Sequence, residues 1–150
     1  MYRHDVQRSG AAPTKIPTAL QAAWSTPVGG RLTQPVIADG KVFVASIDAH
    51  TVYALAADSG RIVWTCTAGG RIDSAPTIHK GSVLFGSADG WVYCLRASDG
   101  ALAWRLRAAP EERLVGVYGQ LESAWPVSGA VLVQNDEVYA AAGQIGRAHV

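Results

Sequence analysis

Three tryptophans spaced by 40 residues constrain the fold of this chain more than any other feature. Trp24, Trp64 and Trp104 each close a short apolar segment, and the two stretches between them repeat one another. Matched positions include Pro35 with Pro76, Gly40 with Gly81 and Tyr53 with Tyr93. A period of 20 to 50 residues, roughly, is the sequence signature of a fold built from stacked supersecondary units.

Each repeat unit holds four short segments rich in β-branched and aromatic residues, separated by turn residues. The turns include Asp39-Gly40, Lys80-Gly81 and Asp89-Gly90, and glycine suits them because positive φ costs it little. Helical periodicity is absent from the sequence. Four antiparallel strands in about 40 residues make one propeller blade. The sequence therefore predicts an all-β fold, a β-propeller fragment of about three four-stranded antiparallel blades.

The repeat also predicts the domain organisation. A third unit starts near Gly119, and about nine extra residues between Pro110 and Tyr118 indicate a longer connection before it, the kind of loop in which binding functions gather. The expected parts are an N-terminal lead-in (1–23), a partial propeller (24–142) with blades at about 27–66, 67–106 and an incomplete 119–142, and a tail (143–150).

A recurring motif closes both complete units. The stretch from Ala54 to Trp64 resembles Ala-x-Asp-x-x-Thr-Gly-x-x-x-Trp, the tryptophan docking motif of the pyrroloquinoline quinone-like propeller family, and residues 94–104 resemble it more loosely. The motif's Asp is replaced in both copies, but its Gly and Trp are kept. The resemblance implies that Gly60, Trp64, Gly100 and Trp104 hold neighbouring blades together, since an indole buries about 150 Å² or more.

The family contains quinoprotein dehydrogenases as well as noncatalytic, BamB-like relatives. The dehydrogenases hold quinone and Ca²⁺ in the central channel, commonly with adjacent cysteines. Here Cys66 and Cys94 belong to different units, and no dense group of carboxylates offers the roughly six to eight oxygens that Ca²⁺ takes. We therefore expect no catalytic residues, no metal ligands and no cofactor in these blades. Quinone and Ca²⁺ would bind only if other blades supplied the site.

Composition and charge argue against nucleic acid and the membrane interior as partners. Thirteen Lys and Arg nearly cancel twelve Asp and Glu, and the formal net charge of +1 gives no basic run suited to nucleic acid. No apolar stretch approaches the roughly 20 residues of a membrane span, and the first 20 residues lack the apolar core of a signal peptide. By resemblance, the protein is expected in the periplasm or elsewhere outside the cytoplasm.

Polar residues recur at one position of successive units, just before the innermost strand. Such positions lie at the rim of a propeller channel, where several blades could present donors and acceptors to one ligand. A ring of solvated or mutually paired side chains is the alternative interpretation. The rim candidates are Arg31, Arg71, Asp73, Gln120 and Glu122.

Both ends of the chain suggest a piece of a longer protein. Residues 1–10 resemble the lead-in to a first blade, and Leu20–Thr26 is expected to be an outermost strand that completes a blade whose other strands lie elsewhere. Ile145 to Val150 can be encoded by a sequence that coincides with a common short-read sequencing adapter, which suggests that the tail is not native. The chain's own missing blades are thus among its expected partners.

The leading functional hypothesis is a noncatalytic scaffold that binds a protein or polymer. A fragment of a quinoprotein alcohol or sugar dehydrogenase is the alternative, and a sensor propeller fused to another domain is a third hypothesis.

Overall fold

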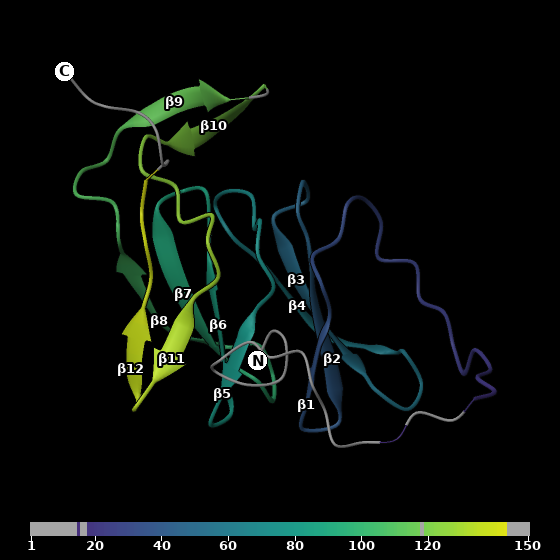
Figure 1. Ribbon diagram of the computed structural model, residues 1–150. Helices are drawn as coiled ribbons and strands as arrows, with labels where there is room; N and C mark the ends of the chain where they lie inside the picture. The colour runs from purple at the N-terminus through teal and green to yellow at the C-terminus, as the bar shows by residue number, and fades with distance from the viewer. Residues whose placement is uncertain (1–14, 16–17, 118, 144–150) are drawn as a thin grey trace.

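A computed structural model describes residues 15, 18–117 and 119–143 of the chain. The described residues form strands and turns without a helix, and two four-stranded antiparallel sheets stand next to each other (Figure 1). This confirms the predicted all-β propeller architecture. The first sheet, blade 1, has the order β1-β2-β3-β4, with β1 Val36–Ala38, β2 Lys41–Ser46, β3 Thr51–Ala56 and β4 Ile62–Thr67.

The second sheet, blade 2, repeats this arrangement in the order β5-β6-β7-β8. Its strands are β5 Thr77–His79, β6 Ser82–Gly86, β7 Trp91–Arg96 and β8 Leu102–Arg107. The two blades share even an irregularity, because the register between the third and fourth strands shifts after Ala54 in blade 1 and after Cys94 in blade 2. The repeat in the sequence is thus a repeat in strand pairing.

Two-residue turns join the first and second strands of each blade. Asp39 and Gly40 have φ angles of 48° and 69°, and Lys80 and Gly81 have 44° and 75°. Positive φ at both central residues is the geometry of the hairpin turn whose twist matches that of the flanking strands. Glycine takes the second place because it reaches positive φ without a steric penalty.

The third unit consists of two separate hairpins in the described residues. β9 Leu114–Val117 pairs with β10 Gln120–Ser123, and β11 Leu132–Gln134 pairs with β12 Glu137–Tyr139. The extra residues expected to form only a connection therefore fold back as a strand onto Gln120–Ser123. Figure 1 shows the β9–β10 hairpin projecting beyond one end of blade 2.

Two apolar clusters hold the three units together. Phe43 and Trp64 from blade 1 pack with Phe85 and Tyr93 from blade 2, and the other face of blade 2 packs against Val127, Val131 and Val133 of the third unit. β5 contacts both β1 and β11, so the innermost strands of the three units lie side by side. Blade 2 is thus covered on both of its faces, by blade 1 and by the third unit.

Tryptophan side chains dock on the turn between the third and fourth strands of the following blade. The Trp64 indole donates a hydrogen bond to the carbonyl of Ala97 (3.0 Å), and Trp24 donates to Ala57 (2.9 Å). The segment around Trp24 was expected to be a strand, but the structure assigns none to residues 20–26, because no neighbouring strand in the described part of the chain pairs with them. The docking contact forms there without the strand.

Several expectations fall outside the described residues. They include most of the lead-in, at residues 1–14 and 16–17, and residues 144–150 of the tail. Among the residues that are described, no helix is long and apolar enough to cross a membrane.

Candidate binding rim

An equivalent backbone hydrogen bond fixes the rim arginine of each blade, Arg31 in blade 1 and Arg71 in blade 2. The amide of Ile47 donates to the carbonyl of Arg31, and the amide of Ala88 donates to that of Arg71, both at 2.8 Å. Each arginine is thereby held against the turn between the second and third strands of its own blade. The amide of Ser123 also donates to Ala88 (2.7 Å), which brings β10 to the same place.

Arg31 forms a two-pronged ion pair with Asp48. Its Nε and Nη2 atoms donate to the two carboxylate oxygens at 2.9 Å and 2.8 Å, and the side chains remain 67% and 45% exposed. The hydrogen bonds from Arg31 hold the pKa of Asp48 below its usual value. An exposed pair of this kind contributes little to stability because water solvates both charges well.

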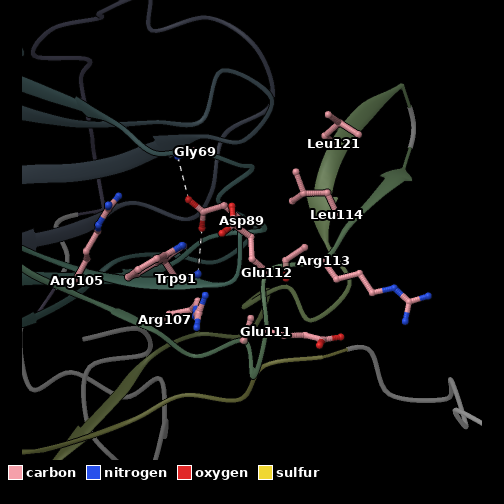
Figure 2. A pocket seen from close by; sticks show the side chains of 12 residues that line it. Gly69, Asp89, Trp91, Arg105, Arg107, Glu111, Glu112, Arg113, Leu114 and Leu121 are labelled. Atoms are coloured by element: carbon pink, nitrogen blue, oxygen red, sulfur yellow. Dashed lines mark hydrogen bonds between the residues drawn. The ribbon is translucent and has the colours of Figure 1, made fainter.

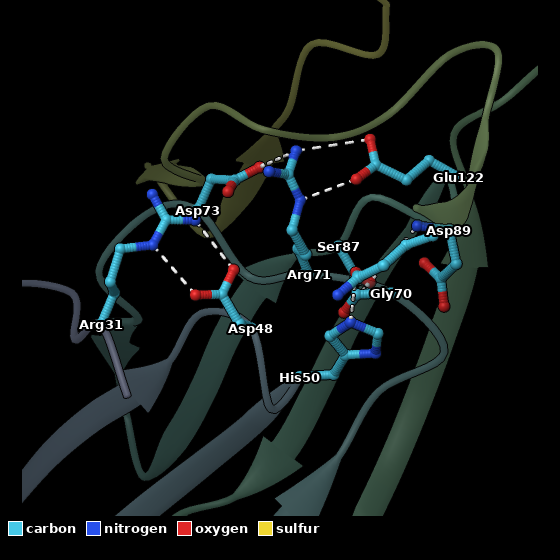
Figure 3. A network of polar contacts seen from close by, with 10 residues as sticks. Arg31, Asp48, His50, Gly70, Arg71, Asp73, Ser87, Asp89 and Glu122 are labelled. Carbon is cyan, nitrogen blue, oxygen red and sulfur yellow. Dashed lines mark hydrogen bonds and ion pairs between the residues drawn. The ribbon is translucent and has the colours of Figure 1, made fainter. Parts of the chain in front are cut away.

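Arg71 joins the second blade to the third unit. Its Nε lies 2.7 Å from Oε1 of Glu122, and its Nη2 lies 3.6 Å from Oδ2 of Asp73 (Figure 3). Glu122 is only 2% exposed, so its carboxylate needs the guanidinium to offset the loss of water. The predicted rim residues Arg71, Asp73 and Glu122 are therefore brought together, and they pair with one another.

Gln120 also reaches across to blade 1. Its Oε1 lies 2.9 Å from Nε2 of His50, a residue 70 positions earlier in the chain. Arg31, Asp48, Arg71 and Gln120 line an open hollow of about 360 Å³. Charged and amide groups from three successive units thus face one space. A ligand there could form hydrogen bonds, and could form ion pairs through groups of either charge.

Asp48 and His50 are rim residues that the sequence reasoning did not single out. Asp48 occupies the same turn as Asp89 of blade 2, and that recurrence at the end of the second strand was the available signal. The two carboxylates have different partners, however. Asp89 accepts hydrogen bonds from Tyr93 and from backbone amides, whereas Asp48 pairs with an arginine.

Away from the rim, the glycines of the docking motif lie in close contact with tryptophan rings. A Cβ added at Gly60 would lie 2.4 Å from the Trp24 indole, and one added at Gly100 would lie 2.6 Å from the Trp64 indole. Trp104, by contrast, is 40% exposed. Glycine at these two turns gives the tryptophan of the preceding segment room to lie flat on the backbone.

Comparison with known proteins identifies the family. A family model described as outer membrane protein assembly factor BamB matches residues 14–148. The chain belongs to the BamB family. BamB of Escherichia coli K12 is 32% identical over 105 residues, which cover 59% of this chain and 26% of that protein. BamB of Yersinia pestis is 34% identical over 107 residues, which cover 70% of this chain and 26% of that protein.

Solved structures agree with this assignment. BamB from Moraxella catarrhalis superposes with a TM-score of 0.66 at 26% identity, over 81% of this chain and 38% of that one. A quinohemoprotein alcohol dehydrogenase from Pseudomonas putida HK5 has a TM-score of 0.67 at 22% identity, over 81% of this chain and 18% of that one, a likeness that concerns the fold alone. The chain spans only 26% of the length of its Escherichia coli and Yersinia pestis relatives.

The fold shared with quinoproteins raises the question of a quinone and Ca²⁺ site. Within the described residues of this BamB-family chain, no three His, Cys, Asp or Glu side chains gather so as to hold a metal ion. Cys66 and Cys94 are free thiols in different blades, and burial raises the pKa of both. The described residues of these blades therefore offer neither adjacent cysteines nor a cluster of acidic metal ligands for such a site.

Proposed function

We propose that this chain is part of a noncatalytic propeller that binds a protein partner at the rim. The observation that carries the proposal is the convergence of polar side chains from three successive units on one open hollow, lined by Arg31, Asp48, Arg71 and Gln120. Arrays of paired charges at a surface give a partner specificity through complementary charges of its own.

A protein is favoured over a small anion or a nucleic acid by the balance of charge. The rim offers carboxylates as well as guanidinium groups, and each described arginine there already has an acidic partner. A phosphate-rich polymer requires an excess of positive charge, and the chain has a formal net charge of only +1. A folded partner can match both signs at once.

The relatives support the same proposal through the role in their name, assembly of outer membrane proteins. For this chain we propose a role as a binding scaffold outside the cytoplasm, without catalysis and without a cofactor held by these blades. Because the chain spans 26% of those relatives, further blades of the whole protein are proposed to complete the surface.

The test exchanges the two members of the exposed rim pair in the whole protein that contains this chain. In R31D/D48R the pair remains, but each charge occupies the other's place, so a partner that recognises them should be lost. The matched control is R96D/D99R, which exchanges a similarly close pair between the last residue of β7 and the turn that follows it, also solvent-exposed (61% and 52%).

Partner binding is measured by photo-crosslinking with envelope extract from a reactive amino acid at Gln34, an exposed position three residues after the rim residue Arg31. We expect one defined product whose yield falls about tenfold in R31D/D48R and is unchanged in R96D/D99R, as for the loss of about 1.4 kcal/mol. An unchanged yield in the rim exchange, or an equal fall in the control, overturns rim recognition.

A further inference from the structure

A second hollow, of about 460 Å³, lies between the outer end of blade 2 and the β9–β10 hairpin (Figure 2). We call it the outer groove. It receives side chains from β7, from β8 and from the hairpin and its approach, and the ones that matter to the argument are Trp91, Arg105, Arg107, Arg113, Leu114 and Leu121.

At one end of the outer groove, an arginine stacks on a tryptophan ring and a second arginine lies beside it. The Arg105 guanidinium lies 4.5 Å from the centre of the Trp91 ring, and Arg107 is the direct cross-strand neighbour of Trp91. None of the ion pairs in the described part of the chain includes Arg105, Arg107 or Arg113, whereas both rim arginines have one. Stacking on the indole orients a guanidinium while leaving its N–H donors available for a carboxylate.

Three carboxylates also border this groove, Asp89, Glu111 and Glu112, but none of them forms an ion pair with Arg105 or Arg107 in the described part of the chain. Asp89 already accepts hydrogen bonds from the amides of Gly69 and Trp91, each at 3.1 Å, and from the Tyr93 hydroxyl at 2.5 Å. Glu111 and Glu112 lie on the loop before the hairpin, and Figure 2 shows Glu111 reaching away from Trp91. Arg105 and Arg107, beside Trp91, therefore have no acidic partner among the described ion pairs and can pair with carboxylates of a bound segment.

The opposite end of the groove is apolar. Leu114 is 53% exposed and Leu121 is 67% exposed. Leu121 pairs with Gly116, and Leu114 pairs with Ser123, so the two leucines are diagonal neighbours on one face of the hairpin. Their side chains line the same hollow as the arginines, which gives the groove a charged end and an apolar end.

Strand β8 supplies an edge along which a chain can lie. It is the last strand in the order of its sheet, and all six of its residues are exposed in the described structure. An unpaired edge presents N–H and C=O groups that an extended peptide can use, and side chains at alternate positions then reach the neighbouring pockets. Arg105 and Arg107 stand at alternate positions of this edge strand.

We propose that the outer groove binds an extended acidic segment of a protein partner, with carboxylates at Arg105 and Arg107 and an apolar side chain against Leu114 and Leu121. A small anion would leave the leucines and the β8 edge unused, so the shape favours a peptide. The groove shares strand β10 with the rim, but none of the rim side chains lines it, so the proposal does not depend on the rim function.

The probe is a fluorescently labelled synthetic peptide of alternating Glu and Leu, compared with peptides of the same length that carry Gln or Lys in place of Glu. Binding to the whole protein is followed by fluorescence anisotropy. The variant R105Q/R107Q removes both charges from the edge strand, and R61Q removes an exposed arginine from the turn before β4 as the matched control. Both are surface changes, and their melting temperatures are expected to match that of the unmodified protein.

We expect the Glu peptide to bind at least about tenfold more tightly than the Lys peptide, to weaken about tenfold in R105Q/R107Q, and to keep its affinity in R61Q and in the rim exchange R31D/D48R. A further variant, L114S/L121S, should weaken all three peptides alike. Equal affinity for the Glu and Lys peptides, or unchanged affinity in R105Q/R107Q, overturns the proposal. So does binding of vesicles of anionic lipid that requires Arg105 and Arg107 when the peptide does not bind.

Discussion

A methyl group added at Gly100 would enter the space that the Trp64 indole occupies. The added Cβ would lie 2.6 Å from Cδ2 and 2.7 Å from Cε3 of the indole, well inside van der Waals contact. Gly100 also has a φ of +74°, which penalises any residue with a Cβ. Gly81 is the matched control, because its φ is +75° and an added Cβ there meets no atom within 4 Å.

The two substitutions separate backbone strain from the docking contact. G81A should cost about 1 to 2 kcal/mol, the penalty of left-handed backbone for an ordinary residue. G100A should cost the same amount plus the displacement of Trp64, which is only 8% exposed. Complete removal of such a core side chain costs about 3 to 5 kcal/mol, and the hydrogen bond to Ala97 is strained as well. We expect an excess of about 2 to 4 kcal/mol for G100A.

Urea unfolding of both variants measures the excess directly. Adding each change to W64L completes the cycle, since leucine lacks the ring atoms that the new methyl would meet. In that background the free energies of unfolding of the G100A and G81A proteins should differ by less than about 0.5 kcal/mol. If G100A and G81A destabilise the original protein equally, the indole does not depend on glycine at the turn, and the docking argument is refuted.

Two further predictions concern pH-dependent stability, and a third concerns the cofactor. Burial and the hydrogen bond to Asp89 raise the pKa of Tyr93 to about 12 from 10.0. The stability that this contributes should be intact below pH 10 and be lost as pH rises towards 12, and the loss should be absent from Y93F. Unfolding at each pH measures the stability, and phenolate absorbance measures the ionisation of Tyr93. Hydrogen bonds from Lys80 and His79 lower the pKa of Asp136 from 3.8. Its contribution is present above that pH and lost as the carboxylate protonates in acid, so D136N should melt earlier than the unmodified protein near neutrality and alike in strong acid. Pyrroloquinoline quinone titrated into this chain in the presence of Ca²⁺ should show no micromolar binding. A bound-cofactor absorbance change would contradict the noncatalytic proposal.

The strands and turns of blades 1 and 2 could be predicted because their signals are local. A two-residue turn ending in glycine sets the register of both strands it joins, and Asp39-Gly40 and Lys80-Gly81 occur at matching places. The β9–β10 hairpin could not be predicted in this way. Gly116 interrupts the apolar run of β9, and the segment has no counterpart in the other units that would reveal its pairing.

The rim was predicted as a set of positions, but not as a set of contacts. Recurrence of a residue type before the innermost strand shows which side chains share one end of a propeller. It does not show that His50 meets Gln120 across 70 residues of sequence, because that contact depends on how neighbouring blades are rotated. Asp48 was hidden for another reason, since an Asp in a turn already has a local explanation.

Burial divides the rim charges into two groups with different consequences. Arg71 is 17% exposed and faces a carboxylate, Glu122, that is 2% exposed, so removing either partner leaves an uncompensated buried charge and costs about 3 to 5 kcal/mol. Arg31 and Asp48 are 67% and 45% exposed and can exchange one partner for another at little cost. In blade 1, moreover, the position equivalent to Asp73 is Thr33, whose hydroxyl accepts a hydrogen bond from Ala45 and adds no charge. The Arg71 cluster therefore ties the hairpin to blade 2, while the Arg31 pair is the part of the rim that a partner can engage without destabilising the fold.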